Sequence, residues 1–546
     1  MAHNSILRLP CLLAVCALAA CQRAEAPRAA APAPAAPAAA SAAEVAESVR
    51  PATIDWFKGD LDAAFAAAAA QHKPVFLYWG AEWCPPCHDL KAYVFSRSDF
   101  QQKMRQFIPV YLDGDAEGAQ RLGAEFKVLG YPTVVVLRPD RTEVARIAGG
   151  MDLGSYADVL DLALEGVKPL PELLASLRAD AKDALSQADC RRMAYNGWHL
   201  DPRADSDPGA LVASLQLAEQ RCPRDAVAER DRLTATAASL AATAELKAVE
   251  GGRAPSPRLR ALLQSVQQLL ADPARSIKVA DALIDLGDNF FIIARHADAA
   301  HNDELRRNWF ALMDAMEASP AFSGTVQLRS AAGRLYAAKA LDAKGVIPPD
   351  VMARARATLD AFLARKYDPD ARAGIVNSAS WVLDYLGDDA RLRTLLQGEM
   401  AISRTPFYYM ADLAALEERT GNKSEALTLL ERAYRESQGP ATRFQWGVLY
   451  VEGLLRMAPQ DEPRIRAATL AVLGELAGPD RIHARTRGRL ERMHKALMGW
   501  SKGAGHAATL TAVDQRWQQI CAALPAGDAT RAECPRLMAT GRTGTG

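Results

Sequence analysis

Two cysteines separated by two residues are the part of this sequence best suited to chemistry. Cys84 and Cys87 flank two prolines and follow Trp83, directly after the apolar run at 75–79. Such a pair closes a small disulfide ring and reopens it, provided that the first thiol is exposed and partly ionised. A strand before the motif and a helix after it would place the first sulfur at a helix N-terminus, where free N–H groups favour the thiolate. The motif therefore predicts thiol–disulfide exchange.

Three other chemistries are compatible with the same residues. Cys84 to His88 also forms the C-x-x-C-H attachment sequence of c-type haem. The pair could instead supply half of a zinc site or an inert structural disulfide. Zinc usually needs a second pair of ligands at close spacing, and the chain has no other C-x-x-C and no H-x-x-x-H. The apolar run before Cys84 and a candidate cis-proline further along favour redox exchange, with no metal and no cofactor.

The first 20 residues have the composition of an export signal. Arg8 supplies the positive charge, and Leu9–Ala20 is an apolar stretch too short to span a bilayer. The stretch ends in Leu-Ala-Ala-Cys, which resembles the bacterial lipobox and implies cleavage before Cys21 and lipidation of its thiol. An ordinary secretory signal cleaved after an A-x-A-like site is the alternative. Gln22, in place of an aspartate, implies an outer-membrane destination by similarity to enterobacterial lipoproteins.

Residues 21–50 are expected to form a lipidated linker. From Ala26 to Ala43 almost every residue is alanine or proline, with no polar–apolar period and too little apolar bulk for a core. We expect a polyproline-II-like tether that holds the folded part several tens of ångströms from the membrane.

The remaining cysteines support export into an oxidising compartment. Of the nine, Cys11 and Cys16 lie in the signal and Cys21 would carry the lipid, which leaves six. These fall into three neighbouring pairs: Cys84 with Cys87, Cys190 with Cys222, and Cys521 with Cys534. An even number of closely spaced cysteines in a secreted chain indicates disulfides, and we expect the last two pairs to be structural.

The elements around the Cys-x-x-Cys motif form an α/β pattern over residues 51–169. Strands are expected at 74–79, 107–112, 133–137 and 143–147, and helices at 61–72, 87–94, 98–105, 116–128 and 153–166. Alternating strands and helices followed by a hairpin and a helix predict a sheet with helices on both faces.

This unit resembles thioredoxin. The resemblance is closest to the periplasmic thioredoxin-like domains of the thiol:disulfide interchange reductases, and it rests on four stretches: Gly80-Ala81-Glu82-Trp83-Cys84, Tyr93-Val94-Phe95-Ser96, Leu112-Asp113-Gly114-Asp115 and Gly130-Tyr131-Pro132-Thr133. It implies that Cys84 is the exposed nucleophile and Cys87 the buried resolving thiol. It also implies that Trp83 shields the pair, and that Tyr131 with a cis Pro132 binds an extended substrate peptide.

Two features of the motif bear on the direction of exchange. Because both intervening residues are proline, only the N–H of Cys87 is left inside the turn to donate to the Cys84 thiolate. Fewer donors stabilise the reduced form less, which predicts that the reduction potential of the Cys84/Cys87 pair lies towards the reducing end of the range. In addition, Tyr78 stands where thioredoxins carry a buried aspartate that helps to deprotonate the resolving thiol. Glu82 and His88 are candidate substitutes, but we expect the first to be a solvated loop residue and the second a helix-surface residue.

Beyond residue 170 the pattern predicts only helices. Apolar residues recur at spacings of three and four, broken by Gly, Pro and Asp, so residues 170–546 are expected to form an α-solenoid. The unit at 407–436 resembles a tetratricopeptide repeat, and Gly387 precedes its turn glycine, Gly421, by that repeat's period of 34 residues. Further helix pairs are expected at 326–344 with 349–366 and at 443–457 with 462–477. Such a stack is either a structural platform or a concave surface for a partner.

Other patterns carry less chemistry. His296 and His301 are five residues apart, which does not put them on one helix face, and the basic run at 481–489 is expected to be a solvated helix face. The chain has 65 basic and 65 acidic residues, which gives no support for binding nucleic acid. No nucleotide-binding loop, serine triad or paired-carboxylate motif stands out.

Together these features predict a periplasmic thiol–disulfide oxidoreductase, lipid-anchored to the outer membrane, on the reductase or isomerase side. It would act on exported proteins through Cys84 and Cys87, with an upstream thiol donor, and its helical domain would bind the client or a partner. The alternative is a membrane-tethered helical-repeat adaptor whose thioredoxin module is vestigial or regulatory.

Overall fold

The computed structural model describes residues 54–538 apart from short gaps at 117, 149–155, 157–158, 163–167, 179–183, 202, 503–504 and 529. The described residues belong to one compact unit, which holds both the sheet and the helical region. The predicted export signal, the lipidation at Cys21, the linker and most of the helix predicted at 153–166 lie outside the described residues. No helix in the described part of the chain is long and apolar enough to cross a membrane.

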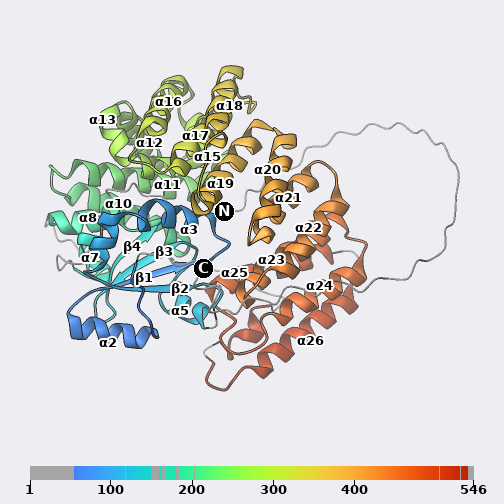
Figure 1. Ribbon diagram of the computed structural model, residues 1–546. Helices are drawn as coiled ribbons and strands as arrows, with labels where there is room; N and C mark the ends of the chain where they lie inside the picture. Colours follow the sequence, from blue (N-terminus) through green and yellow to red (C-terminus); the bar gives the residue numbers. More distant parts are fainter. Residues whose placement is uncertain are drawn as a thin grey trace, which may run out of the picture. The chain divides into compact units, whose positions relative to one another are not determined.

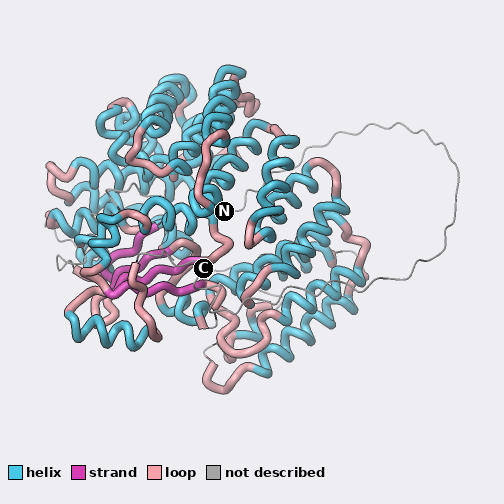
Figure 2. Tube along the Cα trace, viewed as in Figure 1, coloured by secondary structure: helices cyan, strands magenta, loops and turns pink. Residues whose placement is uncertain are grey.

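One mixed sheet of four strands forms between residues 75 and 148, and Figure 2 shows its strands (magenta) gathered in one place. The strands are β1 (Val75–Gly80), β2 (Ile108–Asp113), β3 (Thr133–Leu137) and β4 (Glu143–Ala148). They lie in the order β2-β1-β3-β4, with β1 parallel to β2 and β3 antiparallel to β1 and β4. All four predicted strands are confirmed to within one residue at each end. We call residues 54–148 the sheet unit.

Helices cover both faces of the sheet because β1 is apolar on both sides. The flanking segments are α2 (Leu61–Gln71), α3 (Pro85–Leu90), a π-helical turn (Lys91–Phe95), α4 (Ser98–Met104) and α5 (Ala119–Glu125). Successive side chains of a strand point to opposite faces. Phe76 and Tyr78 therefore enter one core with α3, the π-helical turn and α4, while Leu77 and Trp79 enter a second core with α2.

Two predicted helices of the sheet unit differ from the structure. The helix predicted at 87–94 begins two residues earlier, at Pro85, since proline fits the first turn of a helix, where its missing N–H is not needed. The helix predicted at 116–128 is shorter, because Gly118 precedes it at a φ of 76°, and the N–H of Val128 bonds back to the carbonyl of Gly123. The helices predicted at 61–72 and 98–105 are confirmed to within one residue at each end.

The described chain from residue 170 onward is helical, as predicted, and Figure 1 colours it from green to red. We call it the helical array. Its α-helices are α7 (Leu170–Arg178), α8 (Gln187–Tyr195), α9 (Arg203–Ser206), α10 (Pro208–Arg221), α11 (Val227–Glu250), α12 (Pro257–Leu270), α13 (Pro273–Ser276), α14 (Ala280–Ile284), α15 (Gly287–Ala297), α16 (Asn302–Ala318), α17 (Gly324–Leu341), α18 (Pro349–Leu363), α19 (Pro369–Leu386), α20 (Asp389–Ile402), α21 (Pro406–Arg419), α22 (Lys423–Glu436), α23 (Pro440–Met457), α24 (Glu462–Gly474), α25 (Ala484–Trp500) and α26 (Ala507–Ala523).

The predicted repeat units are helix pairs that pack against one another. The unit predicted at 407–436 consists of α21 and α22, and the other two predicted pairs are α17 with α18 and α23 with α24. Gly421 joins α21 to α22 at a φ of 90°, a backbone conformation that favours glycine. α22 also packs against α23, and α19 packs against α17 and α20, so the pairs form a continuous stack.

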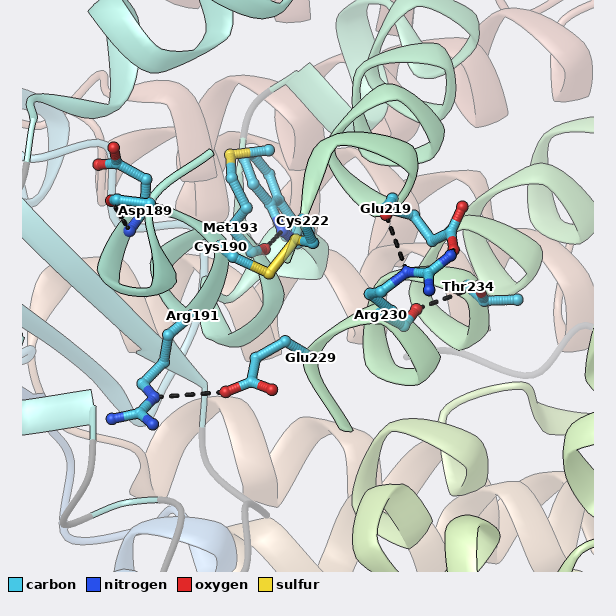
Figure 3. Close-up of a disulfide and its surroundings, with 11 residues drawn as sticks. Asp189, Cys190, Arg191, Met193, Glu219, Cys222, Glu229, Arg230 and Thr234 are labelled. Carbon is cyan, nitrogen blue, oxygen red and sulfur yellow. Dashed lines mark hydrogen bonds and ion pairs between the residues drawn. A yellow bond between two sulfur atoms is a disulfide. The ribbon is translucent and has the colours of Figure 1, made fainter. Parts of the chain in front are cut away.

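Two disulfides join parts of the helical array. Figure 3 shows the first, in which Cys190 of α8 is bonded to Cys222, the residue that follows α10. Ion pairs between Arg191 and Glu229 (3.4 Å) and between Arg230 and Glu219 (2.5 Å) lie beside it. The second joins Cys521 of α26 to Cys534, in the 3₁₀ turn Cys534–Arg536. All four cysteines are buried, which supports a structural role.

Candidate redox site

The Cys-x-x-Cys motif lies where β1 passes into α3. Cys84 is the N-cap residue of α3, and the two prolines occupy the first helical positions. In the structure Cys84 and Cys87 are disulfide-bonded, with Cα atoms 5.2 Å apart. The N–H of Cys87 donates to Sγ of Cys84 at 3.2 Å, as the proline argument predicted. The motif therefore has the local geometry that a thiolate at Cys84 needs, with one backbone donor.

The predicted substrate platform lies next to Trp83. The peptide bond between Tyr131 and Pro132 is cis. The ring of Tyr131 meets that of Trp83 edge-on, with centroids 6.0 Å apart, and the Tyr131 hydroxyl accepts a hydrogen bond from Gln120. Trp83 and Tyr131, which are 48 positions apart in the sequence, thus come together beside the redox pair.

Asp115 links this site to the helical array. Its carboxylate accepts a hydrogen bond from Nε1 of Trp83 at 2.8 Å and another from the hydroxyl of Thr442 in α23. Burial, with a smaller effect from the nearby charge of Asp113, raises the pKa of Asp115 to about 7, although the two hydrogen bonds and Arg485 act in the opposite direction. Sequence reasoning quoted Asp115 only as part of the resemblance and assigned it no role.

The redox pair is covered, which corrects the expectation that Cys84 is exposed. Cys84 and Cys87 are each 2% exposed, and both belong to one apolar cluster with residues of the helical array. Tyr408 of α21 stacks on Trp83, with ring centroids 6.3 Å apart, and Trp446 of α23 meets Trp83 edge-on at the same distance. The exposure was wrongly predicted because the covering residues come from elements more than 280 residues further along the chain.

The base of the site holds aromatic rings where thioredoxins have a carboxylate. Tyr78 is buried, and burial raises its pKa above the usual range. Its ring packs against Trp56, Phe95 and Tyr111, with centroids 5.0 to 6.0 Å apart. Tyr78 is therefore a core residue of the sheet unit and not a proton acceptor at neutral pH.

Glu82 and His88 do not lie in solvent, contrary to expectation. Nδ1 of His88 lies 2.6 Å from the carboxylate of Asp370 in α19, and its Nε2 lies 2.6 Å from the carbonyl oxygen of Glu82. Both ring nitrogens of His88 therefore lie against oxygen atoms, one on α19 and one on the backbone before Cys84. Burial would raise the pKa of Asp370, but hydrogen bonds from His88 and Lys91 outweigh it and hold this pKa below its usual range. The Glu82 side chain is 18% exposed and lies 3.9 Å from Arg404.

Two arginines of the basic run also face the site. Arg485 and Arg489 both donate to the side-chain oxygen of Gln445, at 2.8 and 2.9 Å. The guanidinium carbon of Arg485 lies 4.4 Å from the centre of the Tyr131 ring. Burial, and then the charges of Arg485 and Arg492, lower the pKa of Arg489 to about 9. The expectation of a solvated helix face is thus wrong for these two residues.

Metal and haem chemistry find no further support in the described part of the chain. No group of three or more His, Cys, Asp or Glu side chains is arranged there to hold a metal ion. His88, the last residue of the C-x-x-C-H sequence, is engaged by Asp370 and Glu82. His301 pairs with Asp298 on the surface.

Comparison with known proteins agrees with the site. A family model described as thioredoxin-like matches residues 55–139. This segment is a thioredoxin-like domain. The curated relatives include the thiol:disulfide interchange protein DsbD of Yersinia pestis (strain Pestoides F), 33% identical over 93 residues, or 16% of each chain. DsbD of Cronobacter sakazakii is 33% identical over 125 residues, or 21% of each chain. A solved thioredoxin from Thermus thermophilus is 25% identical, with a TM-score of 0.19, and the match covers 20% of this chain and 88% of that one.

The chain spans about a sixth to a fifth of the length of these DsbD relatives. The family model lies within the sheet unit. What the comparisons and the geometry establish together is a thioredoxin-like domain with a Cys-x-x-Cys pair, followed by a large helical region.

Proposed function

We propose that this protein is a thiol–disulfide oxidoreductase that acts on exported proteins, on the reductase or isomerase side. The observation that carries the proposal is the Cys84–Cys87 pair at the start of α3, in a thioredoxin-like domain that also places Tyr131 and a cis Pro132 beside Trp83. The names of the DsbD relatives, which describe thiol:disulfide interchange, support the same chemistry.

The two thiols have separate roles in the exchange. In the reduced protein the Cys84 thiolate attacks one sulfur of a client disulfide, which forms a mixed disulfide and releases one client thiolate. The Cys87 thiolate then attacks Sγ of Cys84 and releases the second client thiolate, so that two electrons pass to the client and the Cys84–Cys87 disulfide remains. An upstream dithiol donor must then reduce that disulfide before the next cycle.

The environment of Cys84 bears on the direction of electron flow. The single backbone donor, from Cys87, stabilises the thiolate less than several donors would, and this favours the reducing side. Titration of the purified protein against glutathione should give a potential nearer the roughly −270 mV of thioredoxin than the roughly −120 mV of strong periplasmic oxidants. A strongly oxidising value would contradict the reductase or isomerase assignment.

A trapping variant tests the exchange itself. Cys87→Ala leaves a mixed disulfide at Cys84 unresolved, so this variant should accumulate covalent partners on non-reducing gels of whole cells. The matched control is Cys84→Ala/Cys87→Ala, which lacks the attacking sulfur and should capture none. Equal capture by both variants, or by neither, would contradict the proposal.

Export and membrane anchoring form part of the same proposal. Cleavage before Cys21 and lipidation of its thiol would leave the protein in the periplasm on an Ala/Pro-rich tether, with the thioredoxin-like domain at residues 51–169 and the helical domain at 170–546. Labelling cells with a radioactive fatty acid should mark the wild-type chain and leave Cys21→Ala unlabelled. Fractionation then distinguishes the outer from the inner membrane.

A second candidate function has one observation in its favour. Because the helical array covers Cys84, a protein whose main work is to bind a partner through that array would also show a buried, unused redox pair. Under this alternative Cys84→Ala/Cys87→Ala should restore the phenotype of a deletion strain fully. Under the oxidoreductase proposal the double variant should fail to do so.

A further inference from the structure

The covering of Cys84 is aromatic and continuous. Trp83, which directly precedes Cys84, contacts the rings of Tyr408 and Trp446 and lies 5.7 Å from the guanidinium carbon of Arg485. The same guanidinium packs on Tyr131, the residue that the thioredoxin resemblance assigns to substrate binding. Side chains of the helical array therefore occupy the face of the sheet unit on which a client would have to lie.

Polar contacts join the two parts around this aromatic patch. Asp370 of α19 pairs with His88 and Lys91, at 2.6 and 2.9 Å. Elsewhere on the rim, Ser323 donates to Asp89 at 3.1 Å and Thr442 donates to Asp115. α19 also packs along α3, the helix that begins at the redox pair. These contacts come from three separate places in the helical array, at Ser323, α19 and Thr442, so the covering is not the effect of one loop.

Three glycines of the helical array stand where the sheet unit comes closest. A Cβ atom added at Gly324 would lie 2.9 Å from the hydroxyl of Tyr93, and one at Gly374 would lie 3.1 Å from a carboxylate oxygen of Asp89. A Cβ atom at Gly439 would lie 2.7 Å from Cβ of Asp115 and 3.0 Å from its carbonyl oxygen. At Gly439 the atoms met are the Cβ and backbone atoms of Asp115, which cannot turn aside, so a side chain larger than hydrogen does not fit there.

We propose that the helical array is an intramolecular cap on the Cys84–Cys87 pair, and that a client reaches Cys84 only when the array and the sheet unit separate. The cap regulates the site that the proposed function assigns to disulfide exchange. The closed arrangement itself rests on the contacts above and does not require that function. A partner or client that opens the cap has to replace the aromatic contacts of Trp83 and the arginine on Tyr131.

A single added methyl group tests the cap. Gly439→Ala places a carbon atom against Asp115 and should force the two parts apart. Gly421→Ala is the matched control, because Gly421 also has a positive φ, 90° against 72°, but a Cβ atom there would meet nothing within 4 Å. After brief reduction, the full-length proteins are treated with iodoacetamide, and the modification of Cys84 is followed by peptide mass spectrometry. When opening and closing are fast, the rate measures the open fraction.

The expected result is a slow reaction in the wild type, roughly a hundredfold or more below the rate in urea-unfolded protein. Gly439→Ala should react at least about tenfold faster than wild type, and Gly421→Ala should match wild type. Thr442→Val, which removes the hydroxyl that bonds to Asp115 and keeps the side-chain volume, should also react faster. If circular dichroism shows that Gly439→Ala has lost native structure, the alkylation rate of Thr442→Val is the test of the cap instead.

Two outcomes would overturn the cap. In the first, Cys84 of the folded wild type reacts within about tenfold of the unfolded rate. In the second, folded Gly439→Ala and Thr442→Val both react at the wild-type rate. Failure of the proposed function has a different signature, in which the variants expose Cys84 to iodoacetamide but exchange with no protein disulfide.

Discussion

The pH dependence of Cys84 reactivity follows from the burial of Asp115. In the closed arrangement its pKa is about 7, raised from 3.8 chiefly by burial. When the cap opens, water reaches the carboxyl group and its pKa returns towards the ordinary value. Between about pH 4 and pH 7 the closed form thus holds a proton that the open form releases, so opening becomes easier as the pH rises.

The size of the effect follows from the shift. Opening that releases one proton gains a factor of about ten per pH unit well below pH 7. At pH 7 the closed form has lost half of its proton, so the open fraction should rise about fiftyfold from pH 5 to pH 7 and level off within about one further pH unit. The titratable groups that face Asp115 do not change the direction of this pH dependence. Burial also raises the pKa of Asp113, which adds in the same direction, and it raises the pKa of Tyr131, which stays neutral over this range.

Asp115→Asn removes the proton that is exchanged. The assay is the iodoacetamide rate at Cys84 from pH 5 to pH 8, divided by the thiolate fraction measured from absorbance near 240 nm in the same protein. Wild type should show the rise of about fiftyfold between pH 5 and pH 7, and Asp115→Asn should vary by less than about threefold. A wild-type rate that stays flat after this correction, or an equal slope in Asp115→Asn, would refute the assignment of the titration to Asp115.

Three further outcomes are expected. Replacing Cys190 and Cys222 by serine removes a crosslink between residues 32 positions apart, so the unfolded chain gains entropy. The free energy of unfolding should fall by about 3.7 kcal/mol in the loop-entropy model, and an unchanged urea midpoint without reductant would contradict this. Asp370→Asn removes the ion pair with Lys91 and should raise the Cys84 alkylation rate about fivefold, since the pair is only partly exposed; an unchanged rate would exclude a role in closure. Gly398→Ala, at an exposed position inside α20 with nothing within 4 Å, should raise stability by about 0.5–1 kcal/mol in thermal unfolding, and a lower midpoint would count against the helix.

Local features of the chain were predictable because they depend on neighbours in sequence. The apolar run of β1, the prolines at the start of α3 and the hairpin of β3 and β4 each lie within a few residues of the groups that determine them. The redox motif, its N-cap position and the single donor from Cys87 were predicted for the same reason. So were the helix pairs around Gly421, where a glycine turn and the spacing of small and large residues mark the unit.

The surroundings of the redox pair were decided by the tertiary structure. Sequence reasoning placed Cys84, His88 and two arginines of the basic run in solvent, because each was assessed on its own element. The structure buries Cys84 under Tyr408 and Trp446 and joins His88 to Asp370.

The physical reason is that periodicity shows which face of a helix is apolar, but not what that face will meet. Contacts between segments about 280 to 400 positions apart depend on the summed geometry of every helix between them, and no local pattern encodes that sum. The sequence by itself therefore determined the chemistry available to Cys84 and Cys87. The packing of the helical array on the sheet unit decided that this chemistry is enclosed.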